Sequence, residues 1–138
     1  MSVGRADGVG AVQDRKAVAE LARRFAVALT TYDYEHLDVQ SLQLSAISSP
    51  AVVARVRGAS RDLVAAKASS VGDAIDSIPS AVTGSQADAF VGTSQVMTSR
   101  YQPAGTKLAG LLEMALSHTS QGWVVTDYRW LLASVAAP

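Results

Sequence analysis

The hydrophobic pattern of this chain changes its period once, near Ser69, and this change constrains the fold more than any other feature. Before this point, apolar residues recur every three or four positions, which is the spacing of an amphipathic helix. Beyond it they recur at every second position, which is the spacing of a strand with one buried face. Helices followed by consecutive strands predict an α+β domain, in which N-terminal helices pack on one face of a strongly curved antiparallel sheet.

The first two helices are predicted on either side of a short polar junction. The first should begin at Ala11 and end within residues 30–32, where β-branched threonines are poor helix formers. Its apolar stripe consists of Val18, Leu21, Phe25, Ala28 and Leu29. Asp33 is expected to cap a second, short helix over residues 33–43.

A third helix has a clear start signal, because Ser48 and Ser49 precede Pro50 and proline suits the first turn of a helix. This helix should continue to Ala68, with a kink at Gly58, since glycine inside a helix costs roughly 1 kcal/mol relative to alanine. The residues expected to be buried are Val52, Val53, Val56, Leu63 and Val64.

The remaining chain predicts four strands, joined by loops rich in serine, threonine and glycine. They cover residues 69–82, 87–100, 106–120 and 122–135. In the last strand, alternation puts Asp127 on the same face as Trp123 and Val125, and Tyr128 and Trp130 on the opposite face. Asp127 is therefore expected to face the concave side of the sheet.

Length and composition indicate one domain over residues 11–135, preceded by a flexible lead over residues 1–10. The 12 basic and 12 acidic residues balance, so no electrostatic footprint for nucleic acid is expected. Cysteine is absent, which excludes a disulfide framework and a cysteine nucleophile. No apolar run approaches the roughly 20 residues of a membrane span, so this chain is expected to be soluble.

The polar junction "TYDYEHLD" has two interpretations. Tyr32, Asp33 and His36 are residue types that transfer protons inside a pocket. Consecutive side chains at a helix boundary point in different directions, however, so they cannot all line one cavity. The favoured interpretation is a corner, with one tyrosine packed under the sheet, Asp33 as a cap and His36 on the surface.

His118 and Asp127 are two further candidates for chemistry. His118 lacks the partners that a metal site needs, because His36 is the only other histidine. Asp127 could act as a base inside the fold, but a pair with an arginine or lysine is favoured. The sequence thus assigns no catalytic residue, no metal ligand and no cofactor.

Three stretches resemble one family. They are "FAVALTTYDYEHLD" (residues 25–38), "SRDLVAAKASSVG" (residues 60–72) and "GWVVTDYRWLL" (residues 122–132). The resemblance is to the Mce-associated membrane proteins of actinobacteria, and it implies a cone-shaped fold similar to nuclear transport factor 2 or cystatin. It also implies a non-enzymatic accessory or scaffold domain on the extracytoplasmic face of the cytoplasmic membrane, which supports Mce-type lipid transport and is anchored by a segment absent from this chain.

The architecture also resembles the assembly scaffolds of type IV secretion and conjugation systems, and these remain the alternative. A third hypothesis is a small-ligand binder or enzyme that uses the inside of the cone, with Tyr32, Tyr34 and Asp127 as polar lining. In the first two cases the expected partners are protein subunits of a membrane complex. A homodimer through the sheet is expected by analogy, and nucleic acid is not expected as a partner.

Overall fold

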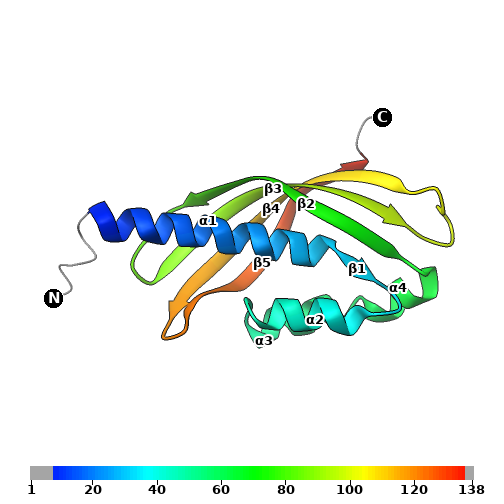
Figure 1. Ribbon diagram of the computed structural model, residues 1–138, viewed down its shortest axis with the longest axis horizontal. Coiled ribbons are helices and arrows are strands. Elements are labelled where there is room, and N and C mark those ends of the chain that lie inside the picture. The colour runs from blue at the N-terminus through cyan, green and yellow to red at the C-terminus, as the bar shows by residue number, and fades with distance from the viewer. Residues whose placement is uncertain (1–7, 136–138) are drawn as a thin grey trace.

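Regular apolar spacing produces the long first helix, α1 (Gly8–Thr30), which lies against one face of a strongly curled sheet (Figure 1). The computed structural model describes residues 8–135. The other elements, in chain order, are β1 (Tyr32–Asp33), α2 (Leu37–Ser45), α3 (Pro50–Arg57), α4 (Ser60–Ala66), β2 (Ser69–Ser80), β3 (Gln86–Thr98), β4 (Thr106–Thr119) and β5 (Gly122–Val135). The five strands form one antiparallel sheet in the order β1-β2-β3-β4-β5. The predicted α+β cone of helices on a curved antiparallel sheet is confirmed.

The junction after α1 differs from the prediction. Tyr32 and Asp33 form the short strand β1, which pairs with Ser70 and Ser69 at the start of β2. The Asp33 carboxylate accepts a hydrogen bond from the backbone N–H of Glu35 at 3.0 Å, which stabilises a turn. The predicted capping role of Asp33 is therefore wrong, because α2 begins at Leu37, beyond the reach of this side chain.

The third predicted helix begins where expected and then divides. The Ser49 hydroxyl accepts a hydrogen bond from Val52 N–H, and Pro50 occupies the first turn of α3. The helix ends at Arg57, next to Gly58, and α4 follows as a separate turn of helix. Val52 and Val53 are buried as predicted, whereas Val64 is half exposed because α4 lies at the edge of the molecule.

The core forms between α1 and the concave face of the sheet. Its largest fully buried side chains include Phe25, Leu44, Leu112, Met114, Leu116 and Val125. Inward and outward positions alternate in β3 and β4, since Ala89, Val91, Leu112 and Met114 are buried and Phe90 points to the other face. Full burial of several leucine- and phenylalanine-sized side chains is the main source of stability in a domain of this size.

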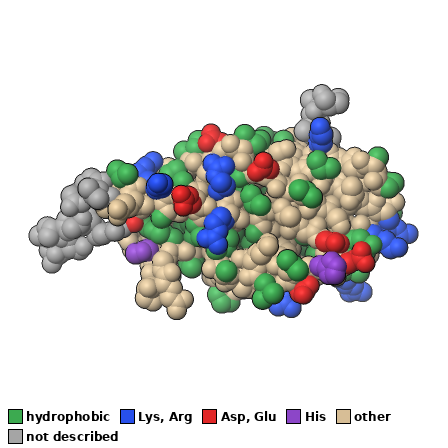
Figure 2. All heavy atoms as spheres, viewed as in Figure 1, with side chains coloured by type: hydrophobic (Ala, Val, Ile, Leu, Met, Phe, Trp, Pro, Cys, Tyr) green, Lys and Arg blue, Asp and Glu red, His purple; other side chains and the backbone are tan. Residues whose placement is uncertain are grey.

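Helix α1 also protects the free edge of β2. Arg23 donates a hydrogen bond to the carbonyl of Ala74 at 3.2 Å, and Arg15 donates one to the carbonyl of Pro79 at 3.1 Å. These bonds satisfy strand carbonyls that no further strand covers, and so blunt an edge that would otherwise pair with another chain. On the side of the molecule where α1 lies, basic and acidic side chains are interspersed at the surface (Figure 2).

The side chains of β5 differ most from the prediction in the direction they face. Val125 pairs with Leu116 and Asp127 with Ala115, so an irregularity at this point shifts the alternation by one residue. Tyr128 consequently faces the concave side together with Val125, and Asp127 is exposed on the outside. The expectation that Asp127 faces the inside of the cone is wrong for this reason.

Two remaining predictions concern the N-terminal lead and a membrane-spanning helix. The predicted lead over residues 1–10 lies mostly outside the described residues, and α1 begins at Gly8, three residues before the predicted start. Within residues 8–135, no helix is long and apolar enough to cross a membrane.

Candidate functional site

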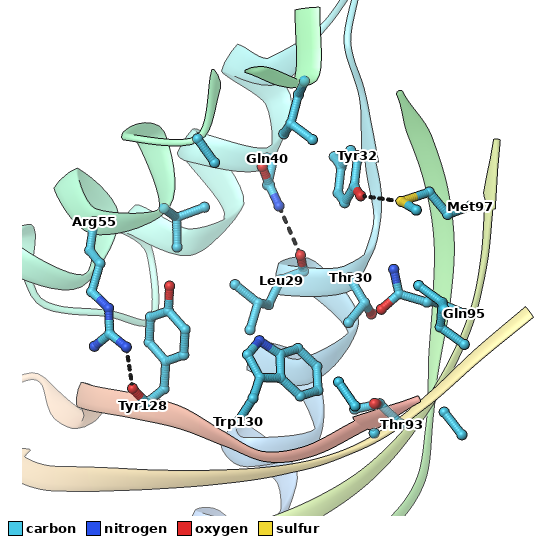
Figure 3. Close-up of a pocket in the computed structure, with 17 residues that line it drawn as sticks. Leu29, Thr30, Tyr32, Gln40, Arg55, Thr93, Gln95, Met97, Tyr128 and Trp130 are labelled. Atoms are coloured by element: carbon cyan, nitrogen blue, oxygen red, sulfur yellow. Dashed lines mark hydrogen bonds between the residues drawn. The ribbon is translucent and has the colours of Figure 1, made fainter. Parts of the chain in front are cut away.

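A cavity of about 330 Å³ lies between the helices and one half of the concave face of the sheet (Figure 3). Its volume is at the lower end of the range for small-molecule sites. The helical side and β1 contribute Leu29, Thr30, Tyr32, Gln40, Arg55, Val56, Ala59 and Leu63. The strands contribute Thr93, Gln95, Met97, Leu108, Ala109, Gly110, Tyr128, Trp130 and Ala133.

The cavity exists because the inward-facing residues of β3 and β4 change along the strands. Val91 lies opposite Leu112 in the packed core, but the next inward position of β3, Thr93, lies opposite Gly110. A Cβ atom on Gly110 would lie 2.6 Å from the ring of Trp130 and 2.9 Å from the Thr93 hydroxyl. Glycine at this position therefore lets the indole ring lie close against β4 and leaves space above it.

The Thr93 hydroxyl is the most unusual polar group of the site. Thr93 is 2% exposed, lines the cavity, and makes no side-chain hydrogen bond to any other described residue. Among the described residues, the fully buried side-chain polar atom without a partner is Ser48 Oγ, so the Thr93 oxygen keeps some exposure to the open cavity. Water or another molecule inside the cavity can therefore reach this hydroxyl.

Tyr32 lies next to Met97 of β3 at one end of the cavity, and its hydroxyl has a weak partner. Its hydroxyl donates to the sulfur of Met97 at 3.3 Å, and a thioether is a poor acceptor. Burial raises the pKa of Tyr32 above its ordinary value, and the Ser70 hydroxyl lowers it by a smaller amount. The phenol is thus neutral at physiological pH and can donate to a better acceptor.

Gln40 is the polar group that closes the cavity on the helical side. Its amide nitrogen donates to the carbonyls of Ala28 and Leu29 at 3.2 and 3.0 Å, at the end of α1. The side chain is 6% exposed and satisfies helix carbonyls that lack a partner within the helix. These bonds hold α2 against α1 and fix the orientation of the Gln40 amide.

Arg55 and Tyr128 form the rim of the cavity. The guanidinium of Arg55 lies 4.1 Å from the centre of the Tyr128 ring and donates to the Tyr128 carbonyl at 2.7 Å. It also pairs with Asp127 at 2.9 Å, although both side chains are at least half exposed. Burial raises the pKa of the Tyr128 hydroxyl, with a smaller lowering by Arg55 and a smaller raising by Asp127.

The structure separates the three predicted ligand-binding residues. Tyr32 lines the cavity, whereas Tyr34 does not, and Asp127 reaches the rim only through Arg55. Asp127 forms the expected pair with an arginine, although that arginine comes from α3 and not from a neighbouring strand. His36 and His118 are exposed, as predicted.

Thr93, Gly110 and Trp130 line the cavity but were not among the predicted site residues. A signal for Thr93 exists in β3, where the inward series Ala87, Ala89, Val91 changes to threonine and glutamine. A polar residue on an otherwise apolar strand face indicates either an error in register or a lined cavity. Trp130 carried no such signal, because its inward direction depends on the irregularity in β5.

The side chains that line the cavity are mostly uncharged. The residues around the cavity include no aspartate, glutamate or histidine, so no side chain there is an obvious general base. In the described part of the chain, no three metal-binding side chains come together. The lining is mostly apolar with a few hydroxyl and amide groups, as in many small-molecule sites.

The opposite face of the sheet is a second candidate surface. Four large apolar side chains on it, Val71, Ile75, Ile78 and Leu132, are each more than half exposed. The strand register places Gly92, Leu111 and Leu132 in one row across three strands, with the Ile78–Phe90 pair beside it. An exposed apolar surface spread over neighbouring strands is unusual for an isolated domain.

Comparison with known proteins identifies the fold. The sequence matches no protein-family model and no curated protein. Solved structures that resemble the chain include an IcmL-like type IV secretion system protein from Legionella pneumophila, with a TM-score of 0.67 and 16% identity, covering 91% of this chain and 95% of that one. The periplasmic domain of DotI gives 0.66 and 14%, covering 88% and 95%, and an NTF2-like protein involved in plasmid conjugation gives 0.57 and 11%, covering 93% and 49%.

These likenesses establish an NTF2-like cone, because identities below 20% carry information about the fold alone. Two of the three proteins are described as secretion or conjugation proteins, which agrees with the alternative drawn from the sequence. None of the three is an Mce-associated protein, so the link to lipid transport rests on the sequence resemblance.

Proposed function

We propose that this chain is a non-enzymatic docking subunit of a membrane-associated protein complex of the secretion or conjugation type. The support from relatives is that similar domains occur in an IcmL-like type IV secretion system protein and in a conjugation protein. Because fold alone does not determine function, the proposal depends on a surface of this chain.

The observation that carries the proposal is the apolar outer face of the sheet. Val71 is 73% exposed and Ile75 68%, on a strand whose opposite face is buried under α1. Burying such side chains against a partner contributes about 25 cal/mol for each Å² of apolar surface removed from water. A subunit that binds another protein through this face would gain most of its affinity there.

Charge indicates what kind of partner fits. Asp73 and Asp76 lie between Val71 and Ile78 along β2, and the Glu113–Arg129 pair lies beside Phe90 across β4 and β5. Both signs are present and the chain has no net charge, so nucleic acid and anionic head groups gain little here. Apolar side chains interspersed with charges of both signs suit a protein partner.

The non-enzymatic part of the proposal draws on the cavity. Catalysis of proton or acyl transfer needs a positioned base or nucleophile within hydrogen-bond reach of the reacting atom. The lining supplies hydroxyl and amide groups together with an arginine that already pairs with Asp127. Such groups bind and orient a molecule, and we assign them no turnover.

The proposed location is the extracytoplasmic side of the cytoplasmic membrane. It is supported by the likeness to a periplasmic domain, the DotI domain, across 88% of this chain. The anchoring segment belongs to the proposal and not to the described residues.

The test is photo-crosslinking in the native cell. A photoreactive amino acid is placed at Ile78 on the outer face of the sheet, and at Asp62 on the exposed side of α4 as the control. We expect the Ile78 position to form a covalent adduct with another subunit of a secretion or conjugation complex, identified by mass spectrometry, and the Asp62 position to form none. An adduct with a second copy of the chain alone, or equal labelling from both positions, would contradict the proposal.

A further inference from the structure

We propose that residues 130–135 of β5, the edge segment, pair with the same residues of a second copy of this chain. The two sheets then form one continuous sheet across a two-fold axis. The proposal goes beyond the docking function, because it concerns an edge of the sheet and not its outer face. It rests on free backbone groups, on exposed apolar side chains and on the protection of the opposite edge.

The pairing of β5 with β4 determines which backbone groups of β5 are free. In an antiparallel pair, the N–H and C=O groups of alternate residues face the partner strand, and those of the residues between them face away. Tyr128 faces away from β4, because its carbonyl accepts a hydrogen bond from Arg55 of α3. The residues of the edge segment that pair with alternate positions of β4 in the same series also face away; they are Trp130, Ala133 and Val135.

The first half of this edge is covered, whereas the edge segment is not. Val125 donates its N–H to the carbonyl of Ile47 at 2.9 Å, and its carbonyl accepts from the N–H of Ser49 at 2.8 Å. Within residues 8–135, no group forms a hydrogen bond with the backbone of the edge segment on the side away from β4. Strand β5 is the last strand of the sheet (Figure 1), so these donors and acceptors are open to another chain.

The side chains of the edge segment favour strand addition. Trp130 is 39% exposed, Leu131 42% and Leu132 60%. The six residues include no charged residue, no proline and no glycine. Natural edge strands usually carry a charge or a proline, or are covered, because an exposed apolar edge pairs with other strands. The edge segment has none of these protections and is therefore a site for an added strand.

The opposite edge of the sheet indicates how two copies can pair. There β1 covers the start of β2, and Arg23 and Arg15 of α1 bind carbonyls further along β2. The β5 edge of one copy is thus not matched by an open β2 edge on the next, and head-to-tail growth is disfavoured. The remaining arrangement is β5 against β5, which a two-fold axis closes as a dimer.

Charge also favours a second copy as the occupant. The edge segment is uncharged, so pairing it with itself opposes no like charges. The nearest charged residues towards the middle of β5 are Arg129 and Asp127. They are already paired with Glu113 and Arg55, so neither presents an isolated charge to the second copy.

One register satisfies the free groups best. With Ala133 of one copy opposite Val135 of the other, both residues exchange their N–H and C=O groups across the axis in each copy. Ser134 then lies opposite Ser134 of the partner subunit, in a pair without backbone hydrogen bonds. Such a pair has its Cα atoms about 4.5 Å apart, which a disulfide can span.

The experiment introduces one cysteine into the full chain. The chain has no cysteine of its own, so within a purified sample the new thiol can pair only with that of another copy. We expect Ser134→Cys to form a disulfide-linked dimer on mild oxidation, seen on a non-reducing gel. Ser94→Cys is the matched control, because Ser94 is an exposed serine in the same row of the sheet, two strands from the edge. It should stay monomeric.

Added charge gives a second test without a covalent bond. Ser134→Lys places two like charges opposite each other at the axis, whereas Ser94→Lys adds the same charge away from it. Sedimentation equilibrium of the unsubstituted chain should show monomers in equilibrium with dimers. We expect Ser134→Lys to weaken this association at least about tenfold and Ser94→Lys to change it by less than about twofold. Circular dichroism checks that each variant is folded.

The proposal would be overturned by a chain that stays monomeric at millimolar concentration, by equal disulfide yields from the two cysteine variants, or by equal effects of the two lysine variants. A Ser134→Cys chain that links in cells to a different protein, and not to itself, would also overturn it. These results are separate from the test of the docking function, because Ile78 lies on β2, three strands from β5.

Discussion

The concave face of the sheet has two halves that the same strands build in different ways. In one half, Val91, Leu112 and Met114 are each at most 1% exposed and pack under Phe25 of α1. In the other half, the same strands continue with Thr93 and Gly110, and the space above them is a cavity. The pair Val91–Leu112 belongs to the packed core, and the next inward pair, Thr93–Gly110, already lies at the cavity.

In this cone, one half of the concave face stabilises the fold and the other half lines a cavity. The filled half buries large apolar side chains and supplies stabilising free energy. The hollow half replaces them with a glycine, a threonine and a glutamine, which fill less volume and carry polar groups. The following predictions test whether the two halves differ energetically as they differ in packing.

The largest effect is expected from truncating the filled half. Leu112→Ala should lower the free energy of unfolding by about 3 kcal/mol, because Leu112 is fully buried and its loss leaves a void. Leu108→Ala, on the same strand but at the cavity, should cost only about 1 kcal/mol, since the site is already open. Urea denaturation measures the free energy of unfolding of both variants. Equal decreases in the two variants would mean that the two halves are packed alike.

Adding one methyl group to the hollow half should have the next largest effect. Gly110→Ala is expected to cost about 1–3 kcal/mol, because the added Cβ would meet Trp130 at 2.6 Å and the Leu132 carbonyl at 3.1 Å. Gly92→Ala is the matched control on the outer face, where the nearest side-chain atom would lie 3.9 Å away. Thermal unfolding should show Gly92→Ala to be neutral or slightly stabilising, and a similar loss in both variants would contradict the close contact at Gly110.

The ion pair at the rim should matter less. Asp127→Asn is expected to change the free energy of unfolding by less than about 1 kcal/mol, because the pair with Arg55 is exposed to water. Arg55→Gln should cost more than Asp127→Asn, since it also removes the bond to the Tyr128 carbonyl and the contact with its ring. Urea denaturation at low and high salt measures the free energy of unfolding of both variants. A larger decrease in Asp127→Asn than in Arg55→Gln would contradict this prediction.

The smallest effect at neutral pH is the titration of the two tyrosines beside the cavity. Burial raises the pKa of Tyr32 and Tyr128 in the folded state, so the unfolded chain ionises first as the pH rises. The contribution to stability is therefore constant below pH 10 and is lost as the pH rises above it. Denaturation curves should show this loss reduced in Tyr32→Phe and in Tyr128→Phe relative to the unsubstituted chain, because each variant removes one partly buried phenol. An alkaline loss as large in both variants as in the unsubstituted chain would contradict burial as its cause.

The sequence predicted the fold better than the site. Helical spacing up to Ala68 and alternation beyond it gave the order of elements, and the serine and proline before α3 gave its start. Of the three predicted ligand-binding residues, Tyr32 lies at the cavity, and its role in binding remains a prediction. Asp127 was misplaced because the irregularity before it inverts the inward and outward assignments that follow, up to a second irregularity after Trp130.

The sequence by itself determined local properties: the periods of the helices and strands, the cap at Ser49, the absence of cysteine and the balance of charge. Only the tertiary structure decided which residues meet across the sheet. Gly110, Thr93 and Trp130 come from three strands, and the space between them depends on register and on two irregularities in the pairing of β4 with β5. A cavity forms where side chains from several distant segments leave a space between them, so no single stretch of sequence encodes it.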